Sequence, residues 1–202
     1  MLIDLSVSLN ESTPVYPGDP ETKITTAGIL DQNGYQDHLV CMGTHVGTHM
    51  DAPSHMIAGG KNLNEFELSR FSGRGIHIPV ESTFDIEALK QAGLLEGDIV
   101  LFDTRLSDKY YSPEYFTNYP AMSEDIAQYL IDSRVSVVGV DACSVDNQEG
   151  FPIHKKLLGS NILIVENLTN LSLLEGKQFK VYAFPIKLEI DGAPVRVVAE
   201  TL

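Results

Sequence analysis

The chain has 202 residues, of which 43% are hydrophobic and 21% are charged, values typical of a globular protein large enough to bury a core. Its formal net charge of −14 argues against nucleic acids and anionic membranes as partners, because both attract basic surfaces. No apolar stretch approaches the ~20 residues of a membrane span, and the first residues do not resemble a signal peptide. We therefore expect a cytoplasmic protein.

Short apolar runs bounded by Gly, Asp and Asn predict a series of β-strands. In chain order the predicted strands are 2–7, 35–43, 75–80, 98–103, 135–141, 162–167 and 179–190. Near the end of the chain, Asp191-Gly192-Ala193 lies between KLEI and PVRVV and predicts a hairpin turn.

Helical patterns lie between several of these strands, over 84–93, 123–133 and 154–159. Ser82 and Thr83 are candidate N-caps of the first helix, because a hydroxyl can accept a hydrogen bond from a free backbone amide of the first turn. A serine and early acidic residues likewise begin the second pattern, which suits the helix dipole.

The order of these elements indicates an α/β fold with a mixed sheet and helices packed on it. The first sixty residues are rich in strands, whereas later segments run from helix to strand. No internal repeat, low-complexity tract or linker divides the sequence. We expect residues 1–202 to form one domain.

Residues 45–55 read HVGTHMDAPSH and hold three of the six histidines of the chain. A straight strand would place His45 and His49 ~13 Å apart, too far for one metal ion to bridge. A straight helix would turn Asp51 away from both. The backbone must therefore bend if these residues form one site, and Gly47 permits such a bend.

Two histidines and a carboxylate are ligands that zinc, manganese and iron accept, with a coordination position left for water. His55 would then lie near that water. A loop with several histidines can also simply face solvent. Spacing alone leaves both interpretations open and names no reaction.

Every fixed position of the same stretch matches the H-x-G-T-H-x-D-x-P-x-H signature of the cyclase family of metal-dependent hydrolases. The chain resembles that family's bacterial kynurenine formamidases and isatin hydrolases, also over 139–171 and in the TPVYPGDP segment at 13–20. The resemblance implies a swivelling β/α/β domain with a central barrel-like mixed sheet and flanking helices. It also implies a homodimer or homotetramer.

The resemblance further implies two divalent metal ions, Zn²⁺ first and Mn²⁺ as the alternative. The implied ligands of the first ion are His45, His49 and Asp51. Asp51 also bridges to the second ion, whose remaining ligands are His154 and Glu166.

Two further roles follow from the same comparison. His55 is implied as the catalytic acid/base, and Tyr16 stands where the formamidases carry a Trp that stacks on the substrate. This chain has no Trp, but a tyrosine ring offers a similar face. We expect Cys143 to be a packing residue, and Ser144 and Asp146 to line the pocket.

The implied function is that of an arylformamidase, which hydrolyses N-formyl-L-kynurenine to L-kynurenine and formate in tryptophan catabolism, using water activated by the metals. Two alternatives remain at this stage. One is a cyclic amide or lactone hydrolase of the isatin hydrolase type. The other is a family member that binds metal without catalysis.

Overall fold

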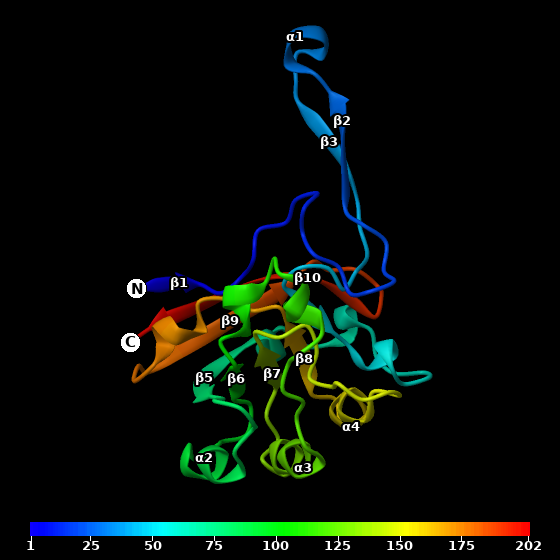
Figure 1. Ribbon diagram of the computed structural model, residues 1–202. Coiled ribbons are helices and arrows are strands. Elements are labelled where there is room, and N and C mark those ends of the chain that lie inside the picture. The colour runs from blue at the N-terminus through cyan, green and yellow to red at the C-terminus, as the bar shows by residue number, and fades with distance from the viewer.

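Strand pairing in the computed structural model, which describes residues 1–202, closes a mixed β-barrel (Figure 1). Its strands are β4 (His49–Asp51), β5 (Ser72–Pro79), β6 (Ile99–Asp103), β7 (Val137–Val140), β8 (Leu163–Glu166), β9 (Phe179–Pro185) and β10 (Gly192–Thr201). Strands β5 to β8 run parallel to one another, and the other pairings are antiparallel. The pairing of β9 with β10 closes the ring, and β1 (Leu2–Asp4) joins β10 from outside. The predicted α/β fold with a barrel-like mixed sheet is confirmed.

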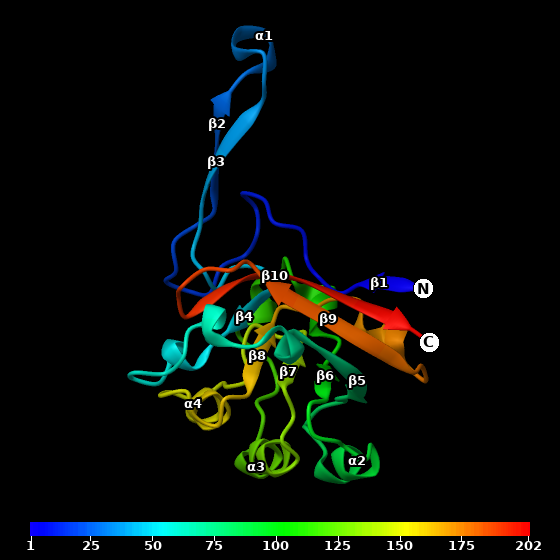
Figure 2. The same cartoon turned by 180° about the vertical axis from the view of Figure 1, so that it is seen from behind.

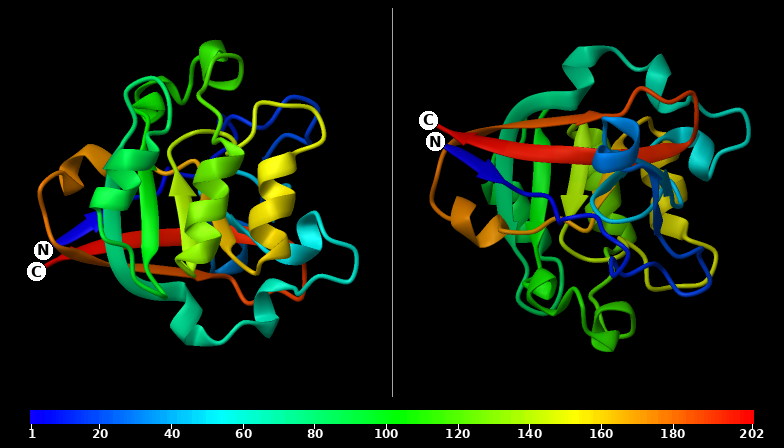
Figure 3. Two further views of the ribbon diagram at one scale, coloured as in Figure 1. Left: turned by 90° about the horizontal axis from the view of Figure 1, so that it is seen from below. Right: turned by 90° about the horizontal axis from the view of Figure 1, so that it is seen from above.

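Three helices lie side by side against the parallel strands: α2 (Ile86–Gln91), α3 (Glu124–Asp132) and α4 (Pro152–Gly159) (Figure 3). Each falls within or around a predicted helix. Ser123 caps α3, as its sequence suggests, by accepting a hydrogen bond from the amide of Ile126 at 3.4 Å.

The predicted N-cap of α2 is wrong. Asp85, and not Ser82 or Thr83, caps the helix by accepting a hydrogen bond from the amide of Glu87 at 2.8 Å. An aspartate is as good an N-cap as a serine, and this one lies directly before the first helical residue.

Strand β6 shows why its sequence is apolar at successive positions. Val100 and Phe102 pack outward beneath the helices, whereas Ile99 and Leu101 fill the barrel interior. A parallel strand covered on both faces has no solvent side, so the polar alternation of a surface strand is absent. The interior is a packed core, and chemistry must lie outside it.

The hairpin predicted at Asp191-Gly192-Ala193 is wrong in position. Strand β9 already ends at Pro185, which pairs with Val195, so the KLEI segment belongs to the connection between the strands. Gly192 instead begins β10 and pairs with Asp51 of β4. The long strand β10 thus passes from one partner to another, a choice that local turn chemistry does not encode.

A slender arm projects from the barrel, away from the helices (Figures 1 and 2). It consists of β2 (Lys23–Gly28), α1 (Leu30–Asn33) and β3 (Asp37–Cys41). The sequence predicted β3 but not β2, and every side chain of β3 is exposed. No helix in the fold is long and apolar enough to cross a membrane.

Candidate metal centre

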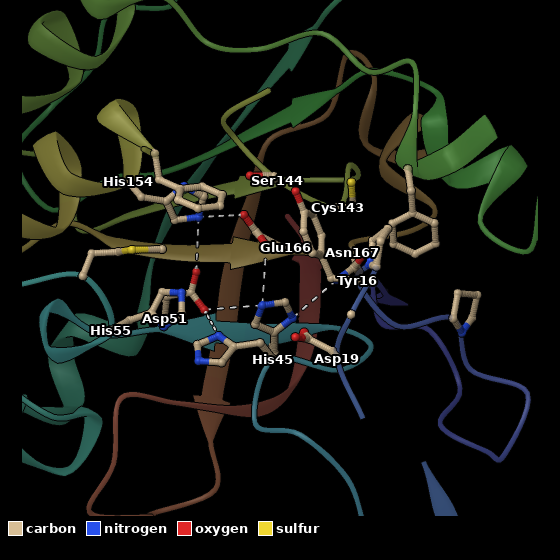
Figure 4. A pocket seen from close by; sticks show the side chains of 17 residues that line it. Tyr16, Asp19, His45, Asp51, His55, Cys143, Ser144, His154, Glu166 and Asn167 are labelled. Atoms are coloured by element: carbon tan, nitrogen blue, oxygen red, sulfur yellow. Dashed lines mark hydrogen bonds and ion pairs between the residues drawn. The ribbon is translucent and has the colours of Figure 1, made fainter. Parts of the chain in front are cut away.

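Strand β4 presents two of the predicted ligands on one face. His49 and Asp51 point outward, toward α4, because the intervening Met50 points into the barrel core. His49 lies directly opposite Glu166 of β8 in the antiparallel register. The alternation of a strand therefore brings three of the predicted donors to the same outer surface (Figure 4).

The predicted bend before β4 is present. Gly47 has a φ of +64°, in the left-handed region that favours glycine, and the turn carries His45 back over the strand. The Nδ1 atom of His45 then lies 2.7 Å from Oδ1 of Asp51. Thr48 fixes the turn to neighbouring segments: its hydroxyl donates to the carbonyl of Asn167 at 2.7 Å and accepts from the amide of Val7 at 2.9 Å.

Helix α4 supplies the fifth donor, His154, from the opposite wall. Asp146 accepts hydrogen bonds from the amides of Ile153 and His154, at 3.0 and 2.8 Å, and from Nδ1 of His154 at 2.8 Å. The ring is thereby held with Nε2 3.0 Å from Oε1 of Glu166 and 3.7 Å from Oδ2 of Asp51. Asp146, expected to line the pocket, is instead the residue that orients His154.

The donors fit divalent cations. His49 donates Nδ1–H to the carbonyl of Gly47 at 2.8 Å, which leaves the lone pair of Nε2 facing Asp51 at 3.4 Å and Glu166 at 3.5 Å. A lone pair and a carboxylate repel each other unless a proton or a cation lies between them. Three groups of three donors each converge within 4.8 Å. Asp51 belongs to two of them, with His45 and His49 and with His154 and Glu166, and the third is His45, His55 and Asp191.

The acid–base behaviour of the cluster reflects the same crowding of acceptors. Burial alone would lower the pKa of His154, but hydrogen bonds to Asp146 and Glu166 raise it to about 10. Burial likewise opposes protonation of His45, yet the contacts with Asp51 and Asp191 raise its pKa to about 9. The cluster attracts positive charge strongly enough to overcome desolvation.

Asp191 also belongs to the site, although the sequence predicted only a turn at this residue. Its Oδ2 lies 3.0 Å from Nε2 of His45 and 3.3 Å from Nδ1 of His55. The rings of His45 and His55 lie with centroids 3.9 Å apart. Burial lowers the pKa of His55, which favours its neutral form beside the metal-ligand candidates. A carboxylate directly before a strand gave no local signal of this role.

A cavity of about 500 Å³ opens onto these donors. Tyr16 contributes to its wall and meets Phe116 edge to face, with ring centroids 6.4 Å apart. The wall contains no Lys or Arg: its other members are Pro14, Pro17, Gly18, Asp19, Met56, Cys143, Ser144, Phe151 and Asn167. The cavity wall thus combines aromatic and apolar side chains with the metal-ligand candidates (Figure 4).

Cys143 is buried as a packing residue beside Glu166, and burial raises the pKa of its thiol to about 12. A thiol with so high a pKa is a poor nucleophile at neutral pH.

Two further aspartates do not belong to the donor groups. Asp103 hydrogen-bonds with His77 at 3.1 Å, and Asp141 accepts a hydrogen bond from the Thr104 hydroxyl at 2.6 Å.

The chain is a closed mixed barrel that carries two overlapping groups of metal-ligand candidates on its outer face. The fold and the site together indicate a metal-binding protein. A family model described as "Putative cyclase" matches residues 3–147. The chain also is 32% identical to a kynurenine formamidase of Salinibacter ruber, over 98% of this chain and 96% of that protein. The chain belongs to this cyclase family.

Solved structures show the same fold. One described as a potential metal-dependent hydrolase with cyclase activity has a TM-score of 0.80 and 30% identity, covering 98% of this chain and 96% of the other. Isatin hydrolase A from Labrenzia aggregata has a TM-score of 0.89 and 22% identity, covering 98% of this chain and 93% of its own. At this lower identity the likeness concerns the fold alone.

The close approach of β10 to the site makes Gly192 a sensitive position. A Cβ atom at residue 192 would overlap the His45 ring, so Gly192→Ala should displace that ring and lower Zn²⁺ affinity by about tenfold or more. Affinity is measured by competition with a chelating dye. Gly159→Ala, where the nearest atom is an ordinary contact at 3.7 Å, is the matched control. Equal affinities of the two variants would contradict the prediction.

The raised pKa values of His45 and His154 predict how the metal-free protein responds to pH. Both histidines bind protons more tightly in the folded than in the unfolded chain. Their contribution to the free energy of unfolding is therefore complete below pH 6.5, the ordinary pKa of a histidine. It is lost as pH rises through about 9 and about 10. The urea midpoint of metal-free protein should fall across this window, and less so in His154→Gln. A constant midpoint in the parent protein would refute the prediction.

Proposed function

We propose that this chain is a metal-dependent hydrolase of amide C–N bonds that converts N-formyl-L-kynurenine to L-kynurenine and formate, a step of tryptophan catabolism. One observation carries the proposal: two groups of three donors share Asp51 at the base of an open cavity, with His55 beside them. The likeness to a kynurenine formamidase over nearly the whole chain supports the choice of substrate.

Divalent ions held by these donors, Zn²⁺ by preference and Mn²⁺ as the alternative, would lower the pKa of bound water to about 7 and polarise a carbonyl oxygen. The residues of the chain supply the rest. His55, with its lowered pKa, is neutral and can accept a proton from the attacking water. It then delivers that proton to the departing amine. Asp191, in contact with Nδ1 of His55, holds the ring for this transfer.

The aromatic wall suits an anilide ring. Tyr16 and Phe116 line the same cavity as the donors, so a substrate ring can pack on them while its formyl group reaches the donors. A site that only holds metal would be closed by protein ligands, whereas here the donors face a cavity of about 500 Å³. The open cavity therefore favours catalysis over a purely structural metal site.

The absence of Lys and Arg from the wall favours a second candidate, hydrolysis of a neutral cyclic amide or lactone as in the isatin hydrolases. N-formyl-L-kynurenine carries a carboxylate that would have to remain at the solvent mouth. Isatin has no such group. A ring-opening assay on isatin, run beside the formamidase assay, separates the two candidates.

Metal-stripped protein should be inactive on N-formyl-L-kynurenine and recover activity when Zn²⁺ or Mn²⁺ is added, with a kcat/KM of ~10⁴ M⁻¹s⁻¹ or more.

His49→Ala should lose bound metal and activity together, because a ligand is removed. His55→Ala should retain its metal and lose turnover by about 10²-fold or more. Metal content is measured by atomic emission. Loss of metal from His55→Ala would contradict the acid/base role.

We also propose that the chain assembles into a homodimer or homotetramer through the arm. Leu30 and Leu39 are 61% and 64% exposed there, and Ile29, Tyr35 and Val40 are exposed beside them. A two-stranded ribbon is at best marginally stable alone in water, so a second surface is needed to cover these side chains.

For the location we propose the cytoplasm, because both cysteines are free thiols.

Light scattering after size-exclusion chromatography tests the assembly. The parent chain should elute as a dimer or tetramer, and Leu30→Lys combined with Leu39→Lys should shift it to a monomer by placing charge in the apolar contact. Leu68→Lys is the matched control, since Leu68 is 71% exposed but lies on the barrel rather than on the arm. A monomeric parent chain would disprove the assembly.

A further inference from the structure

Asn167 follows the ligand candidate Glu166 directly, one residue past the end of β8, and its backbone leaves the extended conformation of the strand. Its φ is +58°, in the left-handed region, and the residue is only 7% exposed. Asparagine tolerates this region better than most residues, but a buried polar side chain there must still find partners. Those partners lie on the elements that build the metal centre.

The side chain of Asn167 joins two segments far apart in the sequence. Its Nδ2 donates to the carbonyl of Gly47 at 2.9 Å, and its Oδ1 accepts from the hydroxyl of Tyr115 at 2.7 Å. The orientation of the amide follows from chemistry, because a carbonyl can only accept a hydrogen bond and Nδ2 must therefore face Gly47. Tyr115 is fully buried, so its hydroxyl is held in place by the core.

The carbonyl of Gly47 has a second donor, Nδ1 of His49 at 2.8 Å. The proton on one ring nitrogen of a histidine determines which nitrogen is free to bind a metal. With Nδ1–H bonded to Gly47, Nε2 is left to face Asp51 and Glu166. The position of one backbone carbonyl thus decides how His49 meets the centre.

We propose that Asn167 is a positioning residue of the metal centre, which holds the Gly47 carbonyl in place and so fixes His49 in the tautomer with a free Nε2. Tyr115 orients Asn167 in turn. This inference rests on the proposed metal centre. It concerns the tautomer of one ligand, which can be observed without any turnover.

Asn167→Asp is the decisive variant, because the carboxylate keeps the size of the side chain but cannot donate to the Gly47 carbonyl. Asn170→Asp is the matched control. Asn170 has nearly the same backbone conformation, with a φ of +59°, and its side chain donates to the carbonyl of Asp4 at 2.9 Å, remote from the donors.

Two measurements test the proposal. Nitrogen-15 spectra of metal-free protein, taken at a pH where they show a neutral His49 ring, report the tautomer, which should be Nδ1–H in the parent chain and in Asn170→Asp, and mixed in Asn167→Asp. Chelator competition should show Zn²⁺ affinity reduced by about 10- to 100-fold in Asn167→Asp and unchanged within about twofold in Asn170→Asp. Tyr115→Phe should give a smaller loss, with little further effect when combined with Asn167→Asp.

An unchanged tautomer and an unchanged Zn²⁺ affinity in Asn167→Asp would overturn the proposal, as would an equal loss of affinity in the Asn170 control. Thermal unfolding of each variant distinguishes a local effect from a general loss of stability. Failure of the proposed function would look different: the parent chain would bind no metal or cleave no amide, while the His49 tautomer would still respond to Asn167→Asp.

Discussion

The buried carboxylate of Asp51 is the constraint around which the site is arranged. It is 1% exposed, and Nδ1 of His45, Nε2 of His49 and Nε2 of His154 all lie within 3.7 Å of it. A buried charge is unfavourable unless it is neutralised, and here the charges of the surrounding histidines hold the pKa of Asp51 well below its usual range despite burial. A divalent cation performs the same neutralisation without a proton. The fold therefore gathers carboxylates and histidines around a position that suits a divalent cation.

The barrel keeps these charged and polar side chains out of its apolar core. Strand β4 is short, yet it is paired on both sides, by β8 and by β10, so its backbone has little freedom. Met50 secures it to the interior while His49 and Asp51 face the helices. Four of the five ligand candidates are thus carried on strands or on α4, and the carboxylates Asp146 and Asp191 hold His154 and His45 from behind.

The metal-ligand candidates and the aromatic wall of the cavity come from different parts of the molecule. The donors come from the barrel, α4 and the turn before β4, whereas Tyr16 and Asp19 of the cavity wall come from the segment that leads into the exposed arm. Loops can change without disturbing the donors, which suits a fold shared by proteins described as kynurenine formamidase and isatin hydrolase.

Much of this arrangement is local in the sequence. The apolar runs indicated the parallel strands and the helices between them, because burial on both faces of a strand leaves a continuous hydrophobic pattern. The spacing of His45, His49 and Asp51 required a bend, and Gly47 provides it with a positive φ. The family signature and the later segment named five donors that the structure brings together.

The sequence by itself determined which residues could bind metal and that the chain between them must turn. The tertiary structure alone decided that Gly192 pairs with Asp51 and not with a hairpin partner, which brings Asp191 within 3.0 Å of His45. It also decided that Asn167 reaches Gly47, 120 residues away in the chain. The reason is physical: local conformational preferences act over a few residues, whereas strand register and the partners of buried polar groups are set by closure of the whole barrel.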